Sequence, residues 1–347
     1  MRLGRLIVYG IFAFLIITAA FLYINSDHII SLYNQKHSTK SDEPIFEYVE
    51  APNKNYSYIY DGKIFMLSGD RMTAIDFNGE ELYQRVLKND GYSLMGAKNF
   101  VFLIDQANGE MDIIDTENHL IMDSEPVNNV NGLKTVDDKI VFFTDDGLNF
   151  ETIIFDENLD PYLSFLSKDA SISLTQLKDG FKVLSLRRTE SGLTTLLTKI
   201  NTKKEIESLF ELEGYVPIKL FSNSKGDIIV TDKEVILIKG DEVVSRKVYD
   251  DFYAMEQLDK NYLLISDGEL SILDDSLNTI TKQPSNGLDH VFRVGNRVII
   301  YGGREFNIIG DNGVIKSVKT ERDIEKIHYD GHIVVEFRNG FLIYKEV

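Results

Sequence analysis

The sequence predicts an all-β protein, an eight-bladed β-propeller that follows a single N-terminal transmembrane helix. The first observation is a repeat, because one short apolar pattern recurs eight times at intervals of 34 to 46 residues. Such a period, with several strands in each copy, is typical of propellers. The eight copies of the repeat begin at Lys63, Asn99, Lys139, Phe181, Asp227, Asn261, Arg297 and His332. The second observation is an uncharged segment near the N-terminus.

Residues 6–24 read LIVYGIFAFLIITAAFLYI and contain no charged side chain. A helix of this length is about 28 Å long, close to the thickness of the hydrocarbon core of a bilayer. Arg2 and Arg5 precede the segment and Asp27 follows it, so the positive-inside rule places residues 1–5 in the cytoplasm. We therefore predict a single-pass protein of the cell membrane whose C-terminal domain is extracytoplasmic.

The alternative for this segment is a cleaved signal peptide. The Thr18–Ala20 triplet weakly resembles a cleavage site, but the apolar run continues past it to Ile24. The run is longer than the roughly 7–15 apolar residues of a signal peptide, so a retained anchor is favoured. Residues 25–44 are mostly polar and are predicted to form a spacer between the membrane and the propeller, which covers residues 45–347.

The composition excludes several classes of function. The chain has no cysteine, which excludes disulfides, lipoprotein processing and a thiol nucleophile. The net charge is −18, and beyond residue 24 it is −20, from 35 basic and 55 acidic residues. Such a surface repels nucleic acid, so we expect no nucleic-acid partner. The simplest interpretation of the acidity is that it keeps an exported domain soluble.

Each repeat is predicted to contain its strands in the same order. A first strand, as at residues 92–98, leads into the recurring apolar segment, whose two apolar faces are typical of a strand between neighbouring blades. A tight turn follows, for example at 106–109 or 267–268. The third strand then alternates apolar and polar residues, which indicates one buried face. Third strands are predicted at residues 72–77, 110–116, 150–156, 194–200, 234–240, 269–274, 305–311 and 341–346.

The turns after the third strands share a pattern of an apolar residue, an Asp, and then Asn, Ser, Asp or Gly. The pattern is clearest in IDFNGEEL (75–82), IDTENHLI (114–121) and LDDSLNTI (273–280). Asp, Asn and Gly favour hairpin turns through side-chain-to-backbone hydrogen bonds and positive φ angles. A calcium loop is the alternative, but the full D-x-D-x-D-G spacing is missing from every copy. We therefore expect structural turns and no metal ligand.

The ends of the repeat region indicate how the ring closes. The eighth repeat stops at Val347 without a fourth strand, and an unassigned apolar stretch, IFEYVEA, lies at 45–51 before the first repeat. We expect residues 45–49 to supply the outer strand of the last blade, because this pairing covers two exposed strand edges. Seven blades is the alternative, if the long repeat at 168–212 is wrongly divided.

The apolar–Asp–x–x–Gly–x–apolar turns resemble those of the quinoprotein-like and NHL-like propeller superfamilies. A short N-terminal anchor followed by an acidic propeller also resembles uncharacterised membrane-anchored propeller proteins of clostridia and other Firmicutes. The resemblance spans the full chain. Quinoprotein propellers carry a tryptophan in each docking motif, and this chain departs from them because it has no tryptophan. The resemblance implies the architecture and no particular chemistry.

No catalytic motif is found. The chain lacks H-E-x-x-H, G-x-S-x-G and a P-loop. His328 and His332 are expected to be hairpin neighbours, and solvated turn histidines are favoured over a metal pair. The alternating Tyr56, Tyr58 and Tyr60 are expected to pack between blades, with an aromatic platform for carbohydrate as the alternative. We therefore predict no catalytic, cofactor-binding or metal-binding residue, and a protein that is not an enzyme.

The candidate partner contact is Arg187 with Arg188, which begin an enlarged loop, RRTESG, between the second and third strands of the fourth repeat. Two adjacent arginines on an acidic domain can pair with carboxylates of a partner. We predict a non-enzymatic, membrane-tethered scaffold that binds an envelope or membrane protein, because a propeller exposes many loops on a rigid frame. The alternative is a sensor or binding module for a small ligand, peptide or glycan at the central channel.

Overall fold

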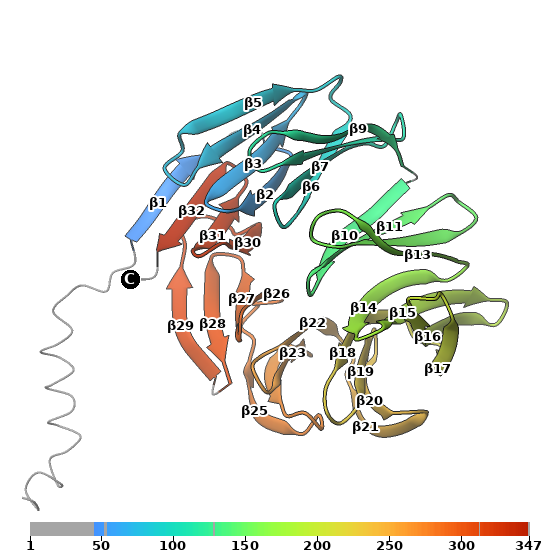
Figure 1. The fold of residues 1–347 in the computed structure, drawn as a ribbon. Coiled ribbons are helices and arrows are strands. Elements are labelled where there is room, and N and C mark those ends of the chain that lie inside the picture. The colour runs from blue at the N-terminus through green and yellow to red at the C-terminus, as the bar shows by residue number, and fades with distance from the viewer. Residues whose placement is uncertain (1–44, 52–53, 128, 312, 346–347) are drawn as a thin grey trace, which may run out of the picture. The chain divides into compact units, whose positions relative to one another are not determined.

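Thirty-two β-strands in the described part of the chain form eight four-stranded sheets arranged in a ring (Figure 1). The computed structural model describes residues 45–51, 54–127, 129–311 and 313–345. Residues 46–344 make one compact unit, and of a second unit only Ile45 and Lys345 are described. In seven sheets the four strands follow one another along the chain. The prediction of an all-β, eight-bladed β-propeller is confirmed.

The predicted N-terminal segments lie outside the described residues. They are the cytoplasmic residues 1–5, the transmembrane helix at 6–24 and the spacer at 25–44. Among the residues that the structure describes, no helix has the length and apolar character needed to cross a membrane.

Blades 1 to 4 each contain four consecutive strands, numbered from the centre of the ring outwards. Blade 1 is β2 (Tyr56–Tyr60), β3 (Lys63–Ser68), β4 (Arg71–Asp76) and β5 (Glu81–Val86). Blade 2 is β6 (Tyr92–Ala97), β7 (Phe100–Asp105), β8 (Glu110–Asp115) and β9 (Leu120–Pro126). Blade 3 is β10 (Asn129–Val136), β11 (Lys139–Asp145), β12 (Phe150–Phe155) and β13 (Pro161–Ser167). Blade 4 is β14 (Ala170–Leu177), β15 (Gly180–Thr189), β16 (Gly192–Asn201) and β17 (Ile206–Glu213).

Blades 5 to 7 repeat this arrangement, and blade 8 borrows its outer strand. Blade 5 is β18 (Pro217–Ser222), β19 (Asp227–Thr231), β20 (Glu234–Lys239) and β21 (Glu242–Val248). Blade 6 is β22 (Phe252–Gln257), β23 (Tyr262–Ser266), β24 (Glu269–Leu273) and β25 (Thr279–Pro284). Blade 7 is β26 (His290–Val294), β27 (Arg297–Gly302), β28 (Glu305–Gly310) and β29 (Gly313–Lys319). Blade 8 is β30 (Lys326–Tyr329), β31 (Ile333–Phe337), β32 (Gly340–Lys345) and β1 (Ile45–Glu50).

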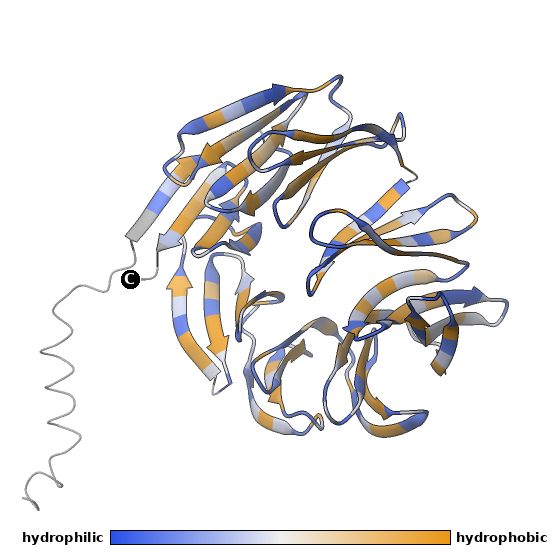
Figure 2. Cartoon of the chain, viewed as in Figure 1, coloured by the Kyte–Doolittle hydropathy of each residue, from blue (hydrophilic) through white to orange (hydrophobic). Residues whose placement is uncertain are grey.

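Burial changes from the second strand to the outer strand of each blade. Every residue of β7, β19, β23 and β31 is buried, whereas every residue of β25 is exposed. Figure 2 shows the same trend, with apolar residues concentrated in the inner and middle strands and polar residues in the turns. The core is therefore a set of apolar layers between neighbouring blades.

Aromatic side chains hold several of these layers together. Phe102 and Phe142 meet edge to face across blades 2 and 3, with ring centroids 5.0 Å apart. Phe306 and Tyr344 meet in the same way across blades 7 and 8, at 5.9 Å. Such pairs add about 0.5–1.5 kcal/mol beyond the burial of area. Aromatic pairs thus join neighbouring blades at both places.

The expected packing of the alternating tyrosines between blades is confirmed for two of the three. Tyr58 and Tyr60 pack against the apolar layer between blades 1 and 2. Tyr56 is 44% exposed, so the expectation is wrong there.

Strand β1 closes the ring by pairing with β32 at the outer edge of blade 8. The Ala51 N–H donates to the Asn339 carbonyl at 2.9 Å. Val49 and Ala51 are buried with Ile59 and Ile64 of blade 1 and with Phe341 of blade 8. The predicted closure by residues 45–49 is confirmed, and the seven-bladed alternative is wrong because residues 168–212 form one blade.

Five turns between third and outer strands share one hydrogen-bonding pattern. The first residue accepts the backbone N–H groups of the residues two and four positions later through one side-chain oxygen, and the residue three positions later has positive φ. The first residues are Asp76, Asp115, Asp156, Asn201 and Asp274. These oxygens are occupied by the turn itself. The interpretation as structural turns is confirmed for these five positions.

Candidate functional site

The predicted contact residues Arg187 and Arg188 lie in a strand and not in a loop. Arg187 pairs with Thr194 and Arg188 with Leu193 in the β15–β16 ladder, and Glu190 and Ser191 alone form the turn. The expectation of an enlarged loop is therefore wrong, because cross-strand pairing continues through the polar residues. Both strands are ten residues long, longer than any other strand in the described chain, so the insertion lengthens the hairpin of blade 4.

Arg187 supports the junction between blades 3 and 4. Its guanidinium binds both carboxylate oxygens of Asp169, with Nε–Oδ1 at 3.0 Å and Nη2–Oδ2 at 2.9 Å. Its Nη1 also lies 3.8 Å from Glu211 Oε1. The hydrogen bonds to Asp169 raise the pKa of Arg187, which stays charged. These groups line a groove of about 240 Å³ whose rim carries the exposed side chains of Leu166 and Ile206.

Arg188 presents a free cation at the tip of the same hairpin. Neighbouring residues of a strand point to opposite faces, so Arg188 lies on the face opposite to Arg187. Its side chain is exposed, and it makes no hydrogen bond or ion pair with another described residue. Leu193, its partner in the ladder, is 37% exposed. The tip therefore combines a cation with an apolar side chain. We call Arg188 and Leu193 the hairpin tip.

A buried polar cluster joins blade 8 to blade 1, and no sequence motif predicts it. Glu336 of β31 lies at its centre. The Glu336 carboxylate accepts from Lys54 Nζ at 2.7 Å and from Ser57 Oγ at 2.8 Å, and it lies 2.7 Å from His328 Nε2. The side chains of Lys54 and Glu336 are 5% and 9% exposed. We call Lys54, Ser57, His328 and Glu336 the closure cluster.

The contacts of the closure cluster fix its charge state. Burial opposes the ionisation of Glu336, but hydrogen bonds from His328 and Lys54 outweigh it and lower the pKa of Glu336 to about 2. Burial also lowers the pKa of His328, so its imidazole is neutral at pH 7. An ionised carboxylate accepts hydrogen bonds only, so His328 Nε2 carries the proton. The cluster therefore holds a buried Lys–Glu ion pair beside a neutral imidazole.

This arrangement is suited to holding blades together and poorly suited to catalysis. The Ser57 hydroxyl donates its hydrogen bond to Glu336 and not to His328, so the contact that activates a serine nucleophile is missing from the cluster. A carboxylate with a pKa of about 2 is a weak base at neutral pH. We therefore regard the closure cluster as a structural latch between the first and last blades.

The two histidines predicted to be hairpin neighbours have different environments. His328 is buried in the closure cluster, so the expectation of a solvated turn histidine is wrong there, because blade 1 covers it. His332 is half-buried, with its ring centroid 5.9 Å from that of Phe77, and its Nδ1 lies 2.8 Å from the Gly331 carbonyl. Within the described ranges, no group of three or more His, Asp or Glu side chains could hold a metal ion.

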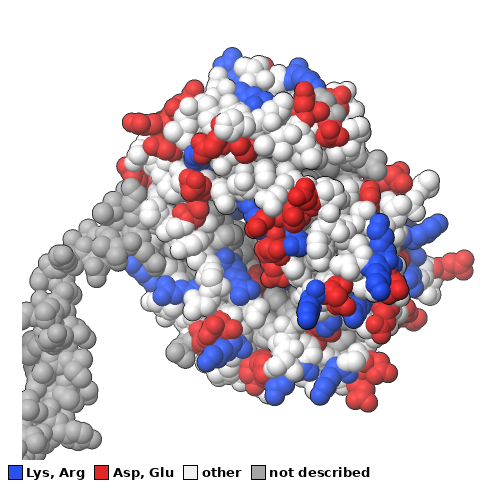
Figure 3. Space-filling model, viewed as in Figure 1, with Lys and Arg blue, Asp and Glu red and all other residues white. Residues whose placement is uncertain are grey.

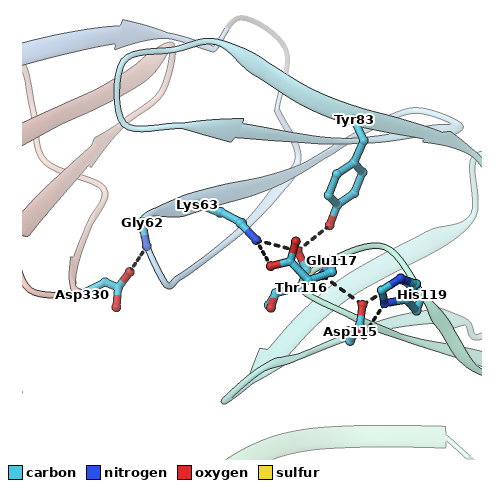
Figure 4. Close-up of polar contacts among 8 residues, drawn as sticks. All are labelled: Gly62, Lys63, Tyr83, Asp115, Thr116, Glu117, His119 and Asp330. Carbon is cyan, nitrogen blue, oxygen red and sulfur yellow. Dashed lines mark hydrogen bonds and ion pairs between the residues drawn. The ribbon is translucent and has the colours of Figure 1, made fainter.

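Further polar contacts join blades at the opposite end of β2 (Figure 4). Lys63 Nζ donates to the Thr116 carbonyl at 3.2 Å and pairs with Glu117, while the Tyr83 hydroxyl donates to the same carbonyl at 3.2 Å. Asp330 of blade 8 accepts the Gly62 N–H of blade 1. Polar side chains thus tie blade 1 to both of its neighbours.

The surface carries charges of both signs. Figure 3 shows acidic and basic side chains interspersed over the visible face, with both kinds around a hollow near the middle of the ring. The overall excess of acidic residues is therefore distributed and does not form one acidic face on this side. Arg188 at the hairpin tip is one exposed basic side chain on a chain of net charge −18.

Comparison with known proteins identifies the fold. No protein-family model matches the sequence, and no curated protein matches it significantly. Sqt1 of Saccharomyces cerevisiae superposes with a TM-score of 0.57 at 10% identity, over 89% of this chain and 97% of that chain. The Dos1 propeller gives 0.58 at 10% identity, over 86% and 94%. The dihydro-heme d1 dehydrogenase NirN gives 0.56 at 10% identity, over 82% and 74%. These similarities show a β-propeller, a fold that carries both enzymes and other proteins.

Proposed function

We propose that this protein is a non-enzymatic, membrane-tethered propeller that binds another protein of the cell envelope through the long hairpin of blade 4. The observation that carries the proposal is the departure of this hairpin from the other blades. Its two ten-residue strands extend the ladder to an exposed tip that carries Arg188 and Leu193. Arginine is enriched at protein interfaces, and the exposed Leu193 beside it adds apolar contact area.

The chemistry of the tip defines the partner surface. Arg188 has no carboxylate partner among the described residues, so it is available for a bidentate pair with an Asp or Glu of the partner. Leu193 offers an apolar contact beside Arg188 on the same face of the hairpin. We infer a partner that presents a carboxylate next to an apolar side chain.

Support for the membrane tether comes from the uncharged residues 6–24 with Arg2 and Arg5 before them. The resemblance to membrane-anchored propellers of clostridia and other Firmicutes agrees with this topology. Support for a non-enzymatic role comes from the closure cluster, whose carboxylate is fully engaged in hydrogen bonds. The propeller would then act as an extracytoplasmic scaffold held close to the membrane.

We expect Arg188→Glu to weaken binding of the envelope partner at least tenfold without changing the melting temperature. The exposed Arg188 makes no contact that the substitution breaks, while the new carboxylate would repel the partner's own. A photo-cross-linking residue at position 193 should give one defined adduct in cells, and Arg188→Glu should remove that adduct.

The matched control is position 71, at the corresponding hairpin of blade 1, where Arg71 is also exposed. A cross-linker there should give no such adduct. Arg187→Glu is not a clean variant, because it places a third carboxylate beside Asp169 and Glu211. An adduct at position 193 that survives Arg188→Glu would contradict the assignment of the hairpin tip.

For the topology, we expect protease added to intact protoplasts to digest a tag placed after Val347. The same tag should resist the protease if a positive charge is moved from residues 1–5 to residues 25–28 so that the segment inverts. A C-terminal tag that stays protected in the wild-type chain would show that the propeller is not extracytoplasmic.

A further inference from the structure

A cavity other than the groove beside Arg187 lies at the junction of blades 3 and 4, and it does not include the hairpin tip. It has a volume of about 280 Å³ and is lined by β10, β11, β12 and the start of β14. Figure 1 shows blades 3 and 4, to which these strands belong, as neighbours in the ring. Pockets for drug-sized ligands span about 300–1,000 Å³, so an occupant of this cavity must be smaller.

A glycine leaves this cavity open. A Cβ added at Gly132 would meet only Phe143 Cδ2, at the ordinary contact distance of 3.6 Å. Gly132 does not have positive φ, so a larger residue would fit the backbone without strain. Gly132 follows a register shift in the β10–β11 ladder, and the absence of a side chain there leaves the space between the two blades open.

The walls combine aromatic and hydroxyl groups. Phe143 and Phe150 supply apolar surface, and Thr152 Oγ1 donates to Ser171 Oγ at 2.9 Å across the junction. A hydroxyl has one donor and two acceptor positions, so the Ser171 hydroxyl can still donate, and both can accept. Aromatic faces with hydroxyl groups beside them suit a hydroxylated ring.

A lysine without a carboxylate partner lies at the edge of the cavity. Lys134 Nζ donates to the Ile172 carbonyl at 2.9 Å and lies 5.6 Å from the centre of the Phe143 ring. It makes no ion pair with any residue in the described part of the chain. Loss of hydration and the nearby Lys219 both lower the pKa of Lys134. Lys219 already pairs with Glu256, so an anion placed here would compensate the charge of Lys134 alone.

The acidic side chain beside the cavity does not oppose an anion. Glu151 pairs with Thr144 in the β11–β12 ladder, and these positions alternate with Phe143 and Thr152. Because alternate residues point to opposite faces, the Glu151 side chain faces blade 2, away from the Lys134 side of the sheet.

We propose that this cavity binds a small hydroxylated carboxylate of the size of one uronic acid ring. The ring lies against Phe143 and Phe150, its hydroxyls bond to Ser171, which Thr152 holds in place, and its carboxylate pairs with Lys134. The site is independent of the partner surface on blade 4.

The test is a calorimetric titration of the full-length chain in detergent with glucuronate as the probe. We expect a dissociation constant of about 1 mM, with glucose binding at least tenfold more weakly because it lacks the carboxylate. Lys134→Gln should weaken glucuronate binding at least tenfold, and Gly132→Val should abolish it by filling the cavity.

Lys233→Gln is the matched control. Lys233 Nζ donates to the Gly214 carbonyl at 2.9 Å and lies 5.4 Å from the centre of the Tyr215 ring, so it has the same kinds of contact away from the cavity. This variant should bind glucuronate like the wild type. If Gly132→Val does not fold, Thr152→Val serves instead, with an expected loss of several-fold. No binding up to about 10 mM, equal affinity for glucose, or unchanged affinity of Gly132→Val would each overturn the proposal.

Discussion

Replacing Glu336 with Gln is expected to lower the free energy of unfolding by about 3–5 kcal/mol at pH 7. The variant leaves the Lys54 ammonium buried beside a neutral amide, because its side chain is only 5% exposed and its other carboxylate contact, Glu325 Oε2, lies at 3.4 Å. Removing one member of a buried ion pair is costly for this reason. Chemical denaturation of the full-length chain in detergent measures the change.

The double variant Lys54→Met with Glu336→Leu is the matched control. It removes both charges together, so it should recover at least half of the stability lost in Glu336→Gln. In Glu336→Gln the amide oxygen can still accept from Ser57 and His328, whereas the double variant leaves both without this acceptor, so the recovered stability is a lower limit for the contribution of the ion pair. A double variant that is less stable than Glu336→Gln would show that the ion pair is not the main contribution of the closure cluster.

The same cluster predicts a specific dependence on pH. The pKa of Glu336 falls from 4.5 to about 2 on folding, so the unfolded chain binds more protons between these values. Stability is therefore lost as pH falls through this window, by about 3 kcal/mol from Glu336 alone. His328, whose pKa is also lowered, adds a loss that begins as pH falls below about 6.5. In Glu336→Gln the lower part of this acid-induced loss should be much smaller than in the wild type.

The fold could be predicted because its signals are local. Each pattern can be recognised within ten residues: the alternation in the third strands, the apolar second strands and the Asp-containing turns. The eight copies all indicate the same arrangement of strands. Closure by β1 could be predicted because one apolar segment has no place in any other blade. These signals do not depend on knowing which distant residues come together.

The closure cluster could not be predicted because its parts are far apart in the sequence. Lys54 and Glu336 are separated by 282 positions, and they meet only once the ring closes. One signal was available, since Glu336 is a charged residue inside a strand expected to be buried on both faces. The expectation of a loop in blade 4 was wrong for a related reason. Polar residues can continue the cross-strand pairing of two strands when both strands are extended together, as β15 and β16 are.

Deleting residues 45–51 is expected to lower the melting temperature by about 10 °C, whereas deleting residues 35–44 should leave it unchanged. The first deletion removes the buried Val49 and Ala51 from the apolar layer between blades 8 and 1, and it exposes the edge of β32. Burial of a valine contributes about 1.5–3 kcal/mol, and an exposed strand edge promotes association between chains. Differential scanning calorimetry measures the first effect and light scattering the second.

A single substitution tests the same closure without shortening the chain. A Cβ at Gly340 would lie 2.4 Å from the Val49 carbonyl oxygen, so Gly340→Ala must push β1 away from β32. Its matched control is Gly132→Ala, whose Cβ meets one atom at 3.6 Å. We expect Gly340→Ala to reproduce at least half of the fall in melting temperature caused by the deletion, and Gly132→Ala to cause none, since only the first crowds the closing strand. Equal melting temperatures for these two variants and for both deletions would mean that the ring stays closed without β1. The closure cluster would then be the main interaction that holds blades 8 and 1 together.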